Sequence, residues 1–377
     1  MRLIYLDYNA STPLAPAVQE AMLPFLAEHY GHPASGHVLG RASHEAIEDA
    51  RSRVGTLLGV PPEEIVFTSG GTESNNLALK GLAFGRPERR RGHVIISALE
   101  HAAVAEPVRW LAQWGCRVTV VGCDARGVVD PDDVAAVFEP DTFLVSLLHA
   151  NHEIGTIQPV RAVAELCNAR GALFHTDAAQ SAGKISTMVH ELGVDLLSIA
   201  GHKMYAPKGV GALYVRRGVK LVPLLHGAAD ERGLRAGTEN VSQIVGLGKA
   251  TELAAKHTAS AAEHLSGHRN TLLTRLREAV PELSVNGEGA ARLPNTLSVN
   301  FPRVDASRLL RRIPDLCAST GAASDSGEHG LSPTQAAIGL TPEVARGTVR
   351  LSLGWQTNES DVERAASLLA EAWEALR

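Results

Sequence analysis

A pair of glycines after an apolar run is the first feature of the sequence that could do chemistry. Gly70, Gly71 and Thr72 follow the apolar segment Glu64–Thr68. Glycines let the backbone approach an anion, and the first turn of a following helix offers unpaired N–H groups, so this turn is a candidate phosphate cradle. It is neither a Walker A loop nor a G-x-G-x-x-G fingerprint, which disfavours a nucleoside triphosphate or a dinucleotide as ligand. A tight strand-to-helix turn without a ligand is the competing interpretation.

A carboxylate and a lysine follow two further apolar runs. Asp177 comes directly after Leu173–Thr176, and Lys203 comes shortly after Leu196–Ile199. Ligands of open parallel sheets bind at the carboxyl ends of the strands, so both side chains are expected at that edge. Taken alone, Lys203 is either a solvated loop charge or a working amine.

Together these features indicate a site for pyridoxal 5'-phosphate (PLP). PLP needs a lysine for its Schiff base, a carboxylate that keeps its pyridine nitrogen protonated, and a cradle for its phosphate. A ring that stacks on the cofactor is also expected, and His101, which follows the apolar segment His93–Ser97, can supply it. A helix cap or an exposed histidine is the alternative for His101.

The elements that must position these residues are predicted from hydrophobic periodicity. Short apolar runs alternate with segments of helical period, which predicts an α/β fold with a mainly parallel, seven-stranded sheet covered by helices. The expected strands are Glu64–Thr68, His93–Ser97, Arg117–Val121, Phe143–Leu148, Leu173–Thr176, Leu196–Ile199 and Gly211–Val215. The expected helices between them are Ser74–Gly85, His101–Trp114, Asp130–Val137, Val160–Ala169 and Ser181–Ser186.

The pattern changes after about residue 245, where a smaller α+β domain is expected. Its predicted helices and strands are Ile244–Val280, Asn295–Phe301, Val349–Leu353 and Glu359–Leu376. We therefore expect a large domain over residues 15–245 and a small domain formed by residues 1–14 and 246–377. Residues 319–333 are dense in Gly, Ser and polar residues, and loops of this length are commonly functional, so this segment is a candidate active-site lid.

Composition excludes several classes of function. The 377 residues include 36 Lys and Arg against 41 Asp and Glu, a net charge of -5, which disfavours direct nucleic-acid binding. The 4 cysteines form no C-x-x-C pair, so neither a disulfide framework nor a metal site is expected. No signal peptide and no apolar run of membrane-spanning length is recognisable, so we expect a cytoplasmic protein that does not span a membrane.

Motifs along nearly the whole chain extend the PLP pattern. They are Tyr5–Pro13 (YLDYNASTP), Phe67–Asn75 (FTSGGTESN), Glu100-His101, His149–Gln158 (HANHEIGTIQ), His175–Gln180 (HTDAAQ), Gly201–Lys203 (GHK) and Arg235–Asn240 (RAGTEN). With these motifs in this order, the sequence resembles the cysteine desulfurases of the class V aminotransferase family. The resemblance implies the fold of fold-type I PLP-dependent transferases, a homodimer with active sites at the subunit interface, and L-cysteine as substrate. The expected products are L-alanine and a protein-bound persulfide that passes to a sulfur acceptor.

The resemblance also implies roles for single residues. Lys203 resembles the Schiff-base lysine, Asp177 the partner of the pyridine nitrogen, and His101 the histidine that stacks on the ring and handles protons. The other expected contacts are those of the phosphate (Gly71, Thr72, His202 and, from the partner subunit, Thr238), the phenolic oxygen of the ring (Gln180, His152) and the substrate (Arg350, His152).

One departure from the family concerns the nucleophile. The family has a cysteine on a mobile loop, and this loop reads Ser319-Thr-Gly-Ala-Ala-Ser-Asp-Ser-Gly327 here, with Ser324 at the cysteine position. A serine hydroxyl stays protonated near neutral pH and cannot hold a persulfide. Cys317 is expected on the preceding strand and is not a substitute nucleophile. Two cofactor contacts also differ, because His152 replaces an asparagine and Ala200 replaces a serine.

Ser324 leaves three hypotheses open. The chain is an engineered Cys→Ser form of a desulfurase that stops before sulfur transfer, a natural PLP-dependent C–S β-lyase without a catalytic cysteine, or a non-catalytic PLP-binding scaffold. The expected partner is a sulfur-acceptor protein of iron–sulfur assembly, tRNA thiolation or DNA phosphorothioation, and the acidic balance suggests that any nucleic acid is handled by that partner.

Overall fold

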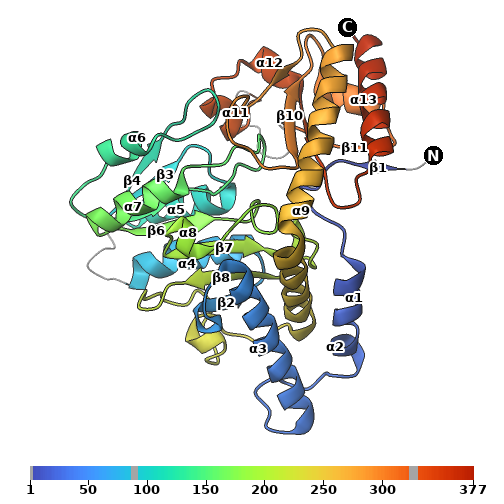
Figure 1. The fold of residues 1–377 in the computed structure, drawn as a ribbon. Helices are drawn as coiled ribbons and strands as arrows, with labels where there is room; N and C mark the ends of the chain where they lie inside the picture. Colours follow the sequence, from blue (N-terminus) through green and yellow to red (C-terminus); the bar gives the residue numbers. More distant parts are fainter. Residues whose placement is uncertain (1–2, 86–91, 322–329) are drawn as a thin grey trace.

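A seven-stranded sheet forms the centre of the computed structural model, which describes residues 3–85, 92–321 and 330–377 (Figure 1). The order of strands is β2-β8-β7-β6-β5-β3-β4. Only β8 runs antiparallel to its neighbours, so the predicted mainly parallel sheet is confirmed. The strands are β2 (Ile65–Thr68), β3 (His93–Ser97), β4 (Arg117–Val121), β5 (Thr142–Ser146), β6 (Leu173–Asp177), β7 (Leu196–Ala200) and β8 (Gly211–Val215). Each lies within one or two residues of its expected bounds at either end.

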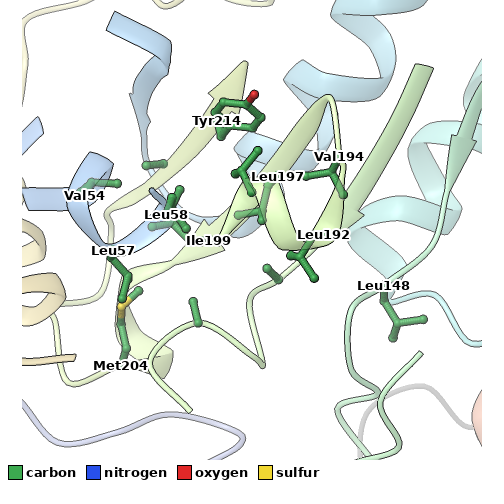
Figure 2. Packing of buried hydrophobic residues seen from close by; sticks show 14 of the residues in the cluster. Val54, Leu57, Leu58, Leu148, Leu192, Val194, Leu197, Ile199, Met204 and Tyr214 are labelled. Atoms are coloured by element: carbon green, nitrogen blue, oxygen red, sulfur yellow. The ribbon is translucent and has the colours of Figure 1, made fainter. Parts of the chain in front are cut away.

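Helices cover both faces of this sheet. They are α3 (Val38–Leu58), α4 (Gly71–Gly85), α5 (Ala102–Gln113), α6 (Pro131–Ala136), α7 (Val160–Arg170) and α8 (Val189–Leu192). Alternate residues of a strand point to opposite faces, and on β2 Phe67 joins the cluster with α3 while Val66 joins the cluster with α4 and α5. Figure 2 shows part of the first cluster, in which Leu58 of α3 lies beside Ile199 of β7.

One predicted helix is wrong. Ser181–Ser186 forms a series of turns, and the helix α8 begins only at Val189. Gly183 has a φ of +74°, which does not fit a right-handed helix, and the Ser181 hydroxyl bonds to His149 instead of facing solvent. These turns hold the buried side chains of Gln180, Ser181 and Lys184 shortly after the end of β6. The other expected helices of the large sheet are present, with ends shifted by up to three residues.

A smaller sheet lies near the two ends of the chain. Its order is β12-β13-β10-β9, all antiparallel, with a separate parallel pair β1-β11 beside it. Its strands are β1 (Ile4–Tyr5), β9 (Ser284–Val285), β10 (Thr296–Asn300), β11 (Leu316–Cys317), β12 (Ser319–Thr320) and β13 (Thr348–Ser352). The helices are α10 (Ala306–Arg311), α11 (Pro333–Ala337), α12 (Pro342–Arg346), α13 (Glu359–Glu374) and the end of α9 (Val241–Ala279). Cys317 lies on β11, as expected.

The long helix α9 links the two sheets. It packs against α3 and α1 (Pro16–Met22) at one end and against α13 at the other, as Figure 1 shows. The short helix α2 (Pro24–Ala27) and the 3-10 turns η1 (Pro62–Glu64), η3 (Gly201–Lys203) and η4 (Glu231–Gly233) complete the elements. The division at residues 15–245 and the lid at residues 319–333 stay predictions. None of the described helices is both long and apolar enough to cross a membrane.

Candidate cofactor and active site

The carboxyl end of the large sheet opens into a cavity of about 310 Å³. This volume lies at the small end of the range of small-molecule sites, roughly 300–1,000 Å³. Most residues that the sequence analysis predicts for the site line this cavity, namely Gly71, Thr72, His101, His152, Asp177, Gln180, His202, Lys203 and Arg350. Thr238 does not line it, and Ser324 lies outside the described residues.

The glycine turn leads directly from β2 into α4. Gly70 has a φ of +149°, a conformation that residues with a Cβ rarely adopt. The helix begins at Gly71, so the unpaired N–H groups of its first turn face the cavity that Thr72 also lines. A Cβ on Gly71 would lie 3.2 Å from the Ala200 Cβ, so the backbone of the turn and the end of β7 approach closely. This is the geometry of an anion cradle.

Lys203 lies in the turn η3 just after β7. Its Nζ donates to the carbonyl oxygens of Asn9 (2.5 Å) and Ala10 (2.9 Å). Burial and the nearby Arg350 charge lower the pKa of Lys203 to about 8, although the carboxylates of Asp177 and Asp7 act in the opposite direction. About a tenth of the amine is therefore uncharged at pH 7, and this fraction grows as the pH rises.

Asp177 ends β6 and is buried. Its Oδ2 accepts a hydrogen bond from Asn75 Nδ2 (2.7 Å), and its Oδ1 accepts one from the Ala179 N–H (2.9 Å). Asn75 lies one helical turn after Thr72 on α4, and its buried Oδ1 has no partner in the described part of the chain. The two bonds hold the carboxylate in one orientation and leave lone pairs free for a cation or an N–H donor.

Two histidine rings meet edge to face at the mouth of the cavity. The centroids of His101 and His152 are 5.2 Å apart, with an interplanar angle of 79°. His101 is exposed and also caps α5, because its Nδ1 accepts the Ala103 N–H (3.0 Å). Burial, with the nearby charges of His101 and Arg350, lowers the pKa of His152 well below its usual value, and its buried Nδ1 has no partner among the described residues. His152 is thus neutral and keeps a ring nitrogen free.

Gln180 and Arg350 close two other sides of the cavity. Gln180 Nε2 donates to the Asn9 carbonyl (2.9 Å). Arg350, on β13 of the small sheet, binds Asp7 Oδ1 through Nη2 (2.8 Å) and the His152 carbonyl through Nη1 (3.2 Å). Its buried Nε has no partner within the described ranges. The guanidinium of Arg350, from the small sheet, therefore lines a cavity at the carboxyl end of the large sheet.

His202 and Thr238 differ in how they relate to the cavity. His202 lines it, and burial together with the charge of Lys203 lowers the pKa of His202 to about 4. Thr238 is exposed and lies in a separate surface hollow, where its Oγ1 is 3.3 Å from His32 Nε2. The structure of one chain thus leaves Thr238 outside its own site.

Sequence reasoning assigned no role to several residues of the site. Asn9 is buried and binds Gln180 and Lys203 through its carbonyl, and Asn75 orients Asp177. Lys184, also buried, bonds to Gln180. Asn9 and Asn75 lie in the motifs Tyr5–Pro13 and Phe67–Asn75, which could have pointed to them, whereas no local signal marks Lys184 as part of the site.

The residues present fit PLP. The amine of Lys203, the oriented carboxylate of Asp177 and the helix terminus at Gly71 line the same cavity, and the orphaned Nδ1 of His152 offers a further polar contact. Each matches a different group of the cofactor: aldehyde, pyridine nitrogen, phosphate and ring oxygen. The roles of the individual residues stay predictions.

Comparison with known proteins gives a family match over most of the chain. Residues 4–365 match the family described as aminotransferase class-V. The chain is 43% identical over 378 residues to the cysteine desulfurase IscS of Dictyoglomus turgidum, covering 100% of this chain and 96% of that protein.

Solved structures agree in fold over the same length. A structure described as a NifS-like protein superposes with a TM-score of 0.93 at 37% identity, covering 100% of both chains. A structure described as SspA in complex with cysteine gives a TM-score of 0.82 at 38% identity, covering 93% of this chain and 98% of that one. The predicted fold of fold-type I PLP-dependent transferases is confirmed by these matches.

Proposed function

The chain belongs to the class V aminotransferase family, and from that premise we propose that it is a cysteine desulfurase that acts on L-cysteine. Its cofactor is PLP, on which this family and its cysteine desulfurases depend. The observation that carries the proposal is that Lys203, Asp177 and Arg350, from two different sheets, line one cavity with a phosphate cradle. The cysteine named for the SspA structure supports the choice of substrate.

Lys203 is the residue proposed to bind the cofactor and to move the proton of the substrate. PLP, when bound, draws electrons from the α-carbon of an attached amino acid and makes its proton acidic. A nucleophile and base must be uncharged, and a pKa of about 8 gives Lys203 that form within reach of neutral pH. The carbonyl oxygens of Asn9 and Ala10 hold the amine in the cavity.

Asp177 is proposed to keep the pyridine nitrogen protonated. A carboxylate does so only if its orientation is maintained, and here Asn75 and the Ala179 N–H bind its two oxygens at 2.7 and 2.9 Å. A charge-assisted hydrogen bond to a carboxylate in a buried site is stronger than a neutral one.

Arg350 is proposed to bind the substrate carboxylate. A planar guanidinium suits this task because it donates two parallel hydrogen bonds. Its Nη2 is bound to Asp7 (2.8 Å), so an incoming carboxylate competes with that residue. His152 beside it contributes a neutral ring, so it adds no further positive charge near the substrate.

Ser324 is proposed to arrest the reaction. The thiolate that would accept the sulfur is missing at this position, and a protonated hydroxyl does not replace it. The rest of the loop keeps the pattern of the family, which supports a desulfurase with a substituted nucleophile, such as an engineered form.

Reversion of the serine tests the proposal. We expect Ser324→Cys to release alanine and, with a reductant, sulfide from L-cysteine, whereas Ser326→Cys on the same loop should stay as inactive as the starting chain. Equal alanine release by the two variants and the starting chain would contradict the desulfurase proposal.

The same serine favours a second candidate, a C–S β-lyase that needs no catalytic cysteine. In that case the unaltered chain converts cysteine into pyruvate, sulfide and ammonia through the same Lys203. Accumulation of pyruvate by the unaltered chain, lost in Lys203→Ala, would support the lyase; no pyruvate would exclude it.

The chain is also proposed to work as a homodimer. Thr238 lies outside the cavity of its own chain, in a surface hollow that also contains Tyr30, which is 76% exposed. An exposed aromatic side chain beside a residue with a proposed cofactor role fits an interface that completes the site of a partner. In a mixture of Lys203→Ala and Thr238→Ala chains, hybrid dimers would regain one intact site, so cofactor content above that of either variant alone supports the proposal. The sulfur acceptor stays a prediction.

A further inference from the structure

Lys184 is a second lysine beside the candidate site, and it has no part in the proposed reaction. It is 8% exposed and lies in the turns that follow β6. Its Nζ donates to Gln180 Oε1 (2.8 Å) and is 3.3 Å from Asn9 Oδ1. Neither acceptor carries a charge, and Lys184 forms no ion pair with any residue that the structure describes.

The surroundings of Lys184 disfavour a positive charge. Burial lowers the pKa of Lys184 well below its usual value, and the neighbouring cations Lys203 and Arg350 lower it further. Asp7 instead pairs with Arg350, and Asp177 is bound by Asn75 and the Ala179 N–H. Lys184 therefore has no compensating negative partner among the described residues, and its contacts with its neighbours are the hydrogen bonds that it donates.

The bond to Gln180 decides which way that amide points. The oxygen and the nitrogen of a glutamine amide have nearly the same size, so its orientation follows from the partners it meets. Because Lys184 donates to Oε1, Nε2 is left to donate to the Asn9 carbonyl (2.9 Å). The same carbonyl accepts from Lys203 Nζ (2.5 Å).

We propose that Lys184 is a positioning residue that orients the amide of Gln180 toward Asn9. Through the shared carbonyl of Asn9, it also holds the Lys203 amine in place. Lys184 does not line the cavity itself. The importance of Lys203 and Gln180 rests on the proposed function, but the network between them belongs to the chain alone.

A double-mutant cycle on cofactor affinity tests the positioning role. We expect Lys184→Met to weaken PLP binding by the apo chain about tenfold, the size expected for one or two lost buried hydrogen bonds. Lys184→Gln, which still carries an N–H donor, should recover part of the loss, and Lys220→Met on the surface should have no effect. In a Gln180→Leu background, Lys184→Met should change the affinity no further, since its partner is gone. An unchanged affinity in Lys184→Met, or an equal loss in the Gln180→Leu background, would overturn the proposal.

If Lys184→Met does not fold, Lys184→Gln takes its place in the cycle. Cofactor affinity does not depend on turnover, so a chain that fails as a desulfurase can still pass this test.

Discussion

Two regions of the molecule bury basic side chains in opposite ways. Arg51 of α3 is 4% exposed, and both of its terminal nitrogens bind Glu231 at 2.8 Å. Burial works against its charge, but the hydrogen bonds and charge of Glu231 outweigh it and raise the pKa of Arg51. Lys184 is similarly buried, but it donates only to amide oxygens, and burial together with the charges of Lys203 and Arg350 lowers its pKa.

The presence or absence of a carboxylate partner distinguishes a buried cation with a structural role from a buried amine that can react. A buried cation with a bidentate carboxylate stays charged and ties distant segments together, here α3 with η4, where Glu231 and Arg232 have φ of 43° and 57°. A buried amine without a carboxylate partner has its pKa lowered, which favours the uncharged, nucleophilic form. Three predictions test this contrast, and a fourth tests the phosphate cradle.

The largest effect is expected at Lys203. In the Ser324→Cys chain, Lys203→Ala should lower alanine formation by at least about 10³-fold, because nucleophile and proton carrier are both lost. The folded pKa of Lys203, about 8, lies below its ordinary value of 10.5, so at neutral pH the buried amine opposes folding. In apo chains, where bound cofactor adds no stability, its removal should therefore leave the Tm unchanged or higher. A large fall in Tm would mean that Lys203 stabilises the fold, as Arg51 does. Lys220→Ala is the surface control.

Breaking the ion pair between Arg51 and Glu231 is expected to lower stability and to leave cofactor binding intact. Glu231→Gln leaves the Arg51 charge buried against an amide, which should cost about 3–5 kcal/mol of unfolding free energy in a denaturant titration. Asp49→Asn in the partly exposed pair with Arg53 should cost only about 0–1 kcal/mol. The folded fraction of Glu231→Gln should still bind PLP. Similar stability of the two variants would show that Arg51 does not depend on its carboxylate.

Glu100 is a buried acid in which burial likewise shifts the pKa toward the uncharged form. Burial raises its pKa to about 8, although Ser97 Oγ and the Leu148 N–H bind the carboxyl at 2.6 and 2.9 Å. Between the ordinary pKa of 4.5 and about 8, the folded chain holds a proton that the unfolded chain has lost. The contribution of Glu100 to stability should therefore fall as pH rises through this window, by at most about 1.4 kcal/mol per pH unit.

The control for this pH dependence is Glu100→Gln. We expect the unfolding free energy of the variant, measured with urea from pH 5 to pH 8, to decrease less with pH than that of the starting chain. An identical pH profile of the unfolding free energy in both chains would mean that Glu100 is charged when folded.

The smallest effect is expected in the phosphate cradle. Ala200→Ser places a hydroxyl close to Gly71, where an added Cβ would lie 3.2 Å from the Ala200 Cβ. One added neutral hydrogen bond should strengthen PLP binding by about 0.5–1.5 kcal/mol, measured by equilibrium dialysis. Ala178→Ser, which is fully buried outside the cavity lining, should not do so. Weaker PLP binding in Ala200→Ser would contradict the proposed position of the phosphate beside Gly71.

Much of the site could be predicted because its signals are local. Asp177 ends a short strand that begins with Leu173 and Phe174, Lys203 follows the mostly apolar β7, and Gly70 precedes a helix, so the edge of the sheet was visible in the sequence. The helix expected at Ser181–Ser186 is wrong because Gly183 and the bond from Ser181 to His149 favour turns. The helices before residue 60 were not predicted at all.

The sequence by itself determined the order of strands along the chain, the residues at their carboxyl ends and the resemblance to a PLP-dependent family, because each depends on neighbours in the chain. Only the tertiary structure decided that Arg350 of the small sheet reaches the cavity and that Asn9 joins Gln180 and Lys203. Such contacts join residues that are far apart in the chain, 171 positions for Asn9 and Gln180, and set the dielectric and charge around each amine. The pKa of a group depends on that environment as well as on residue type, which is why burial lowers the pKa of Lys184 and Lys203 while Glu231 raises that of Arg51.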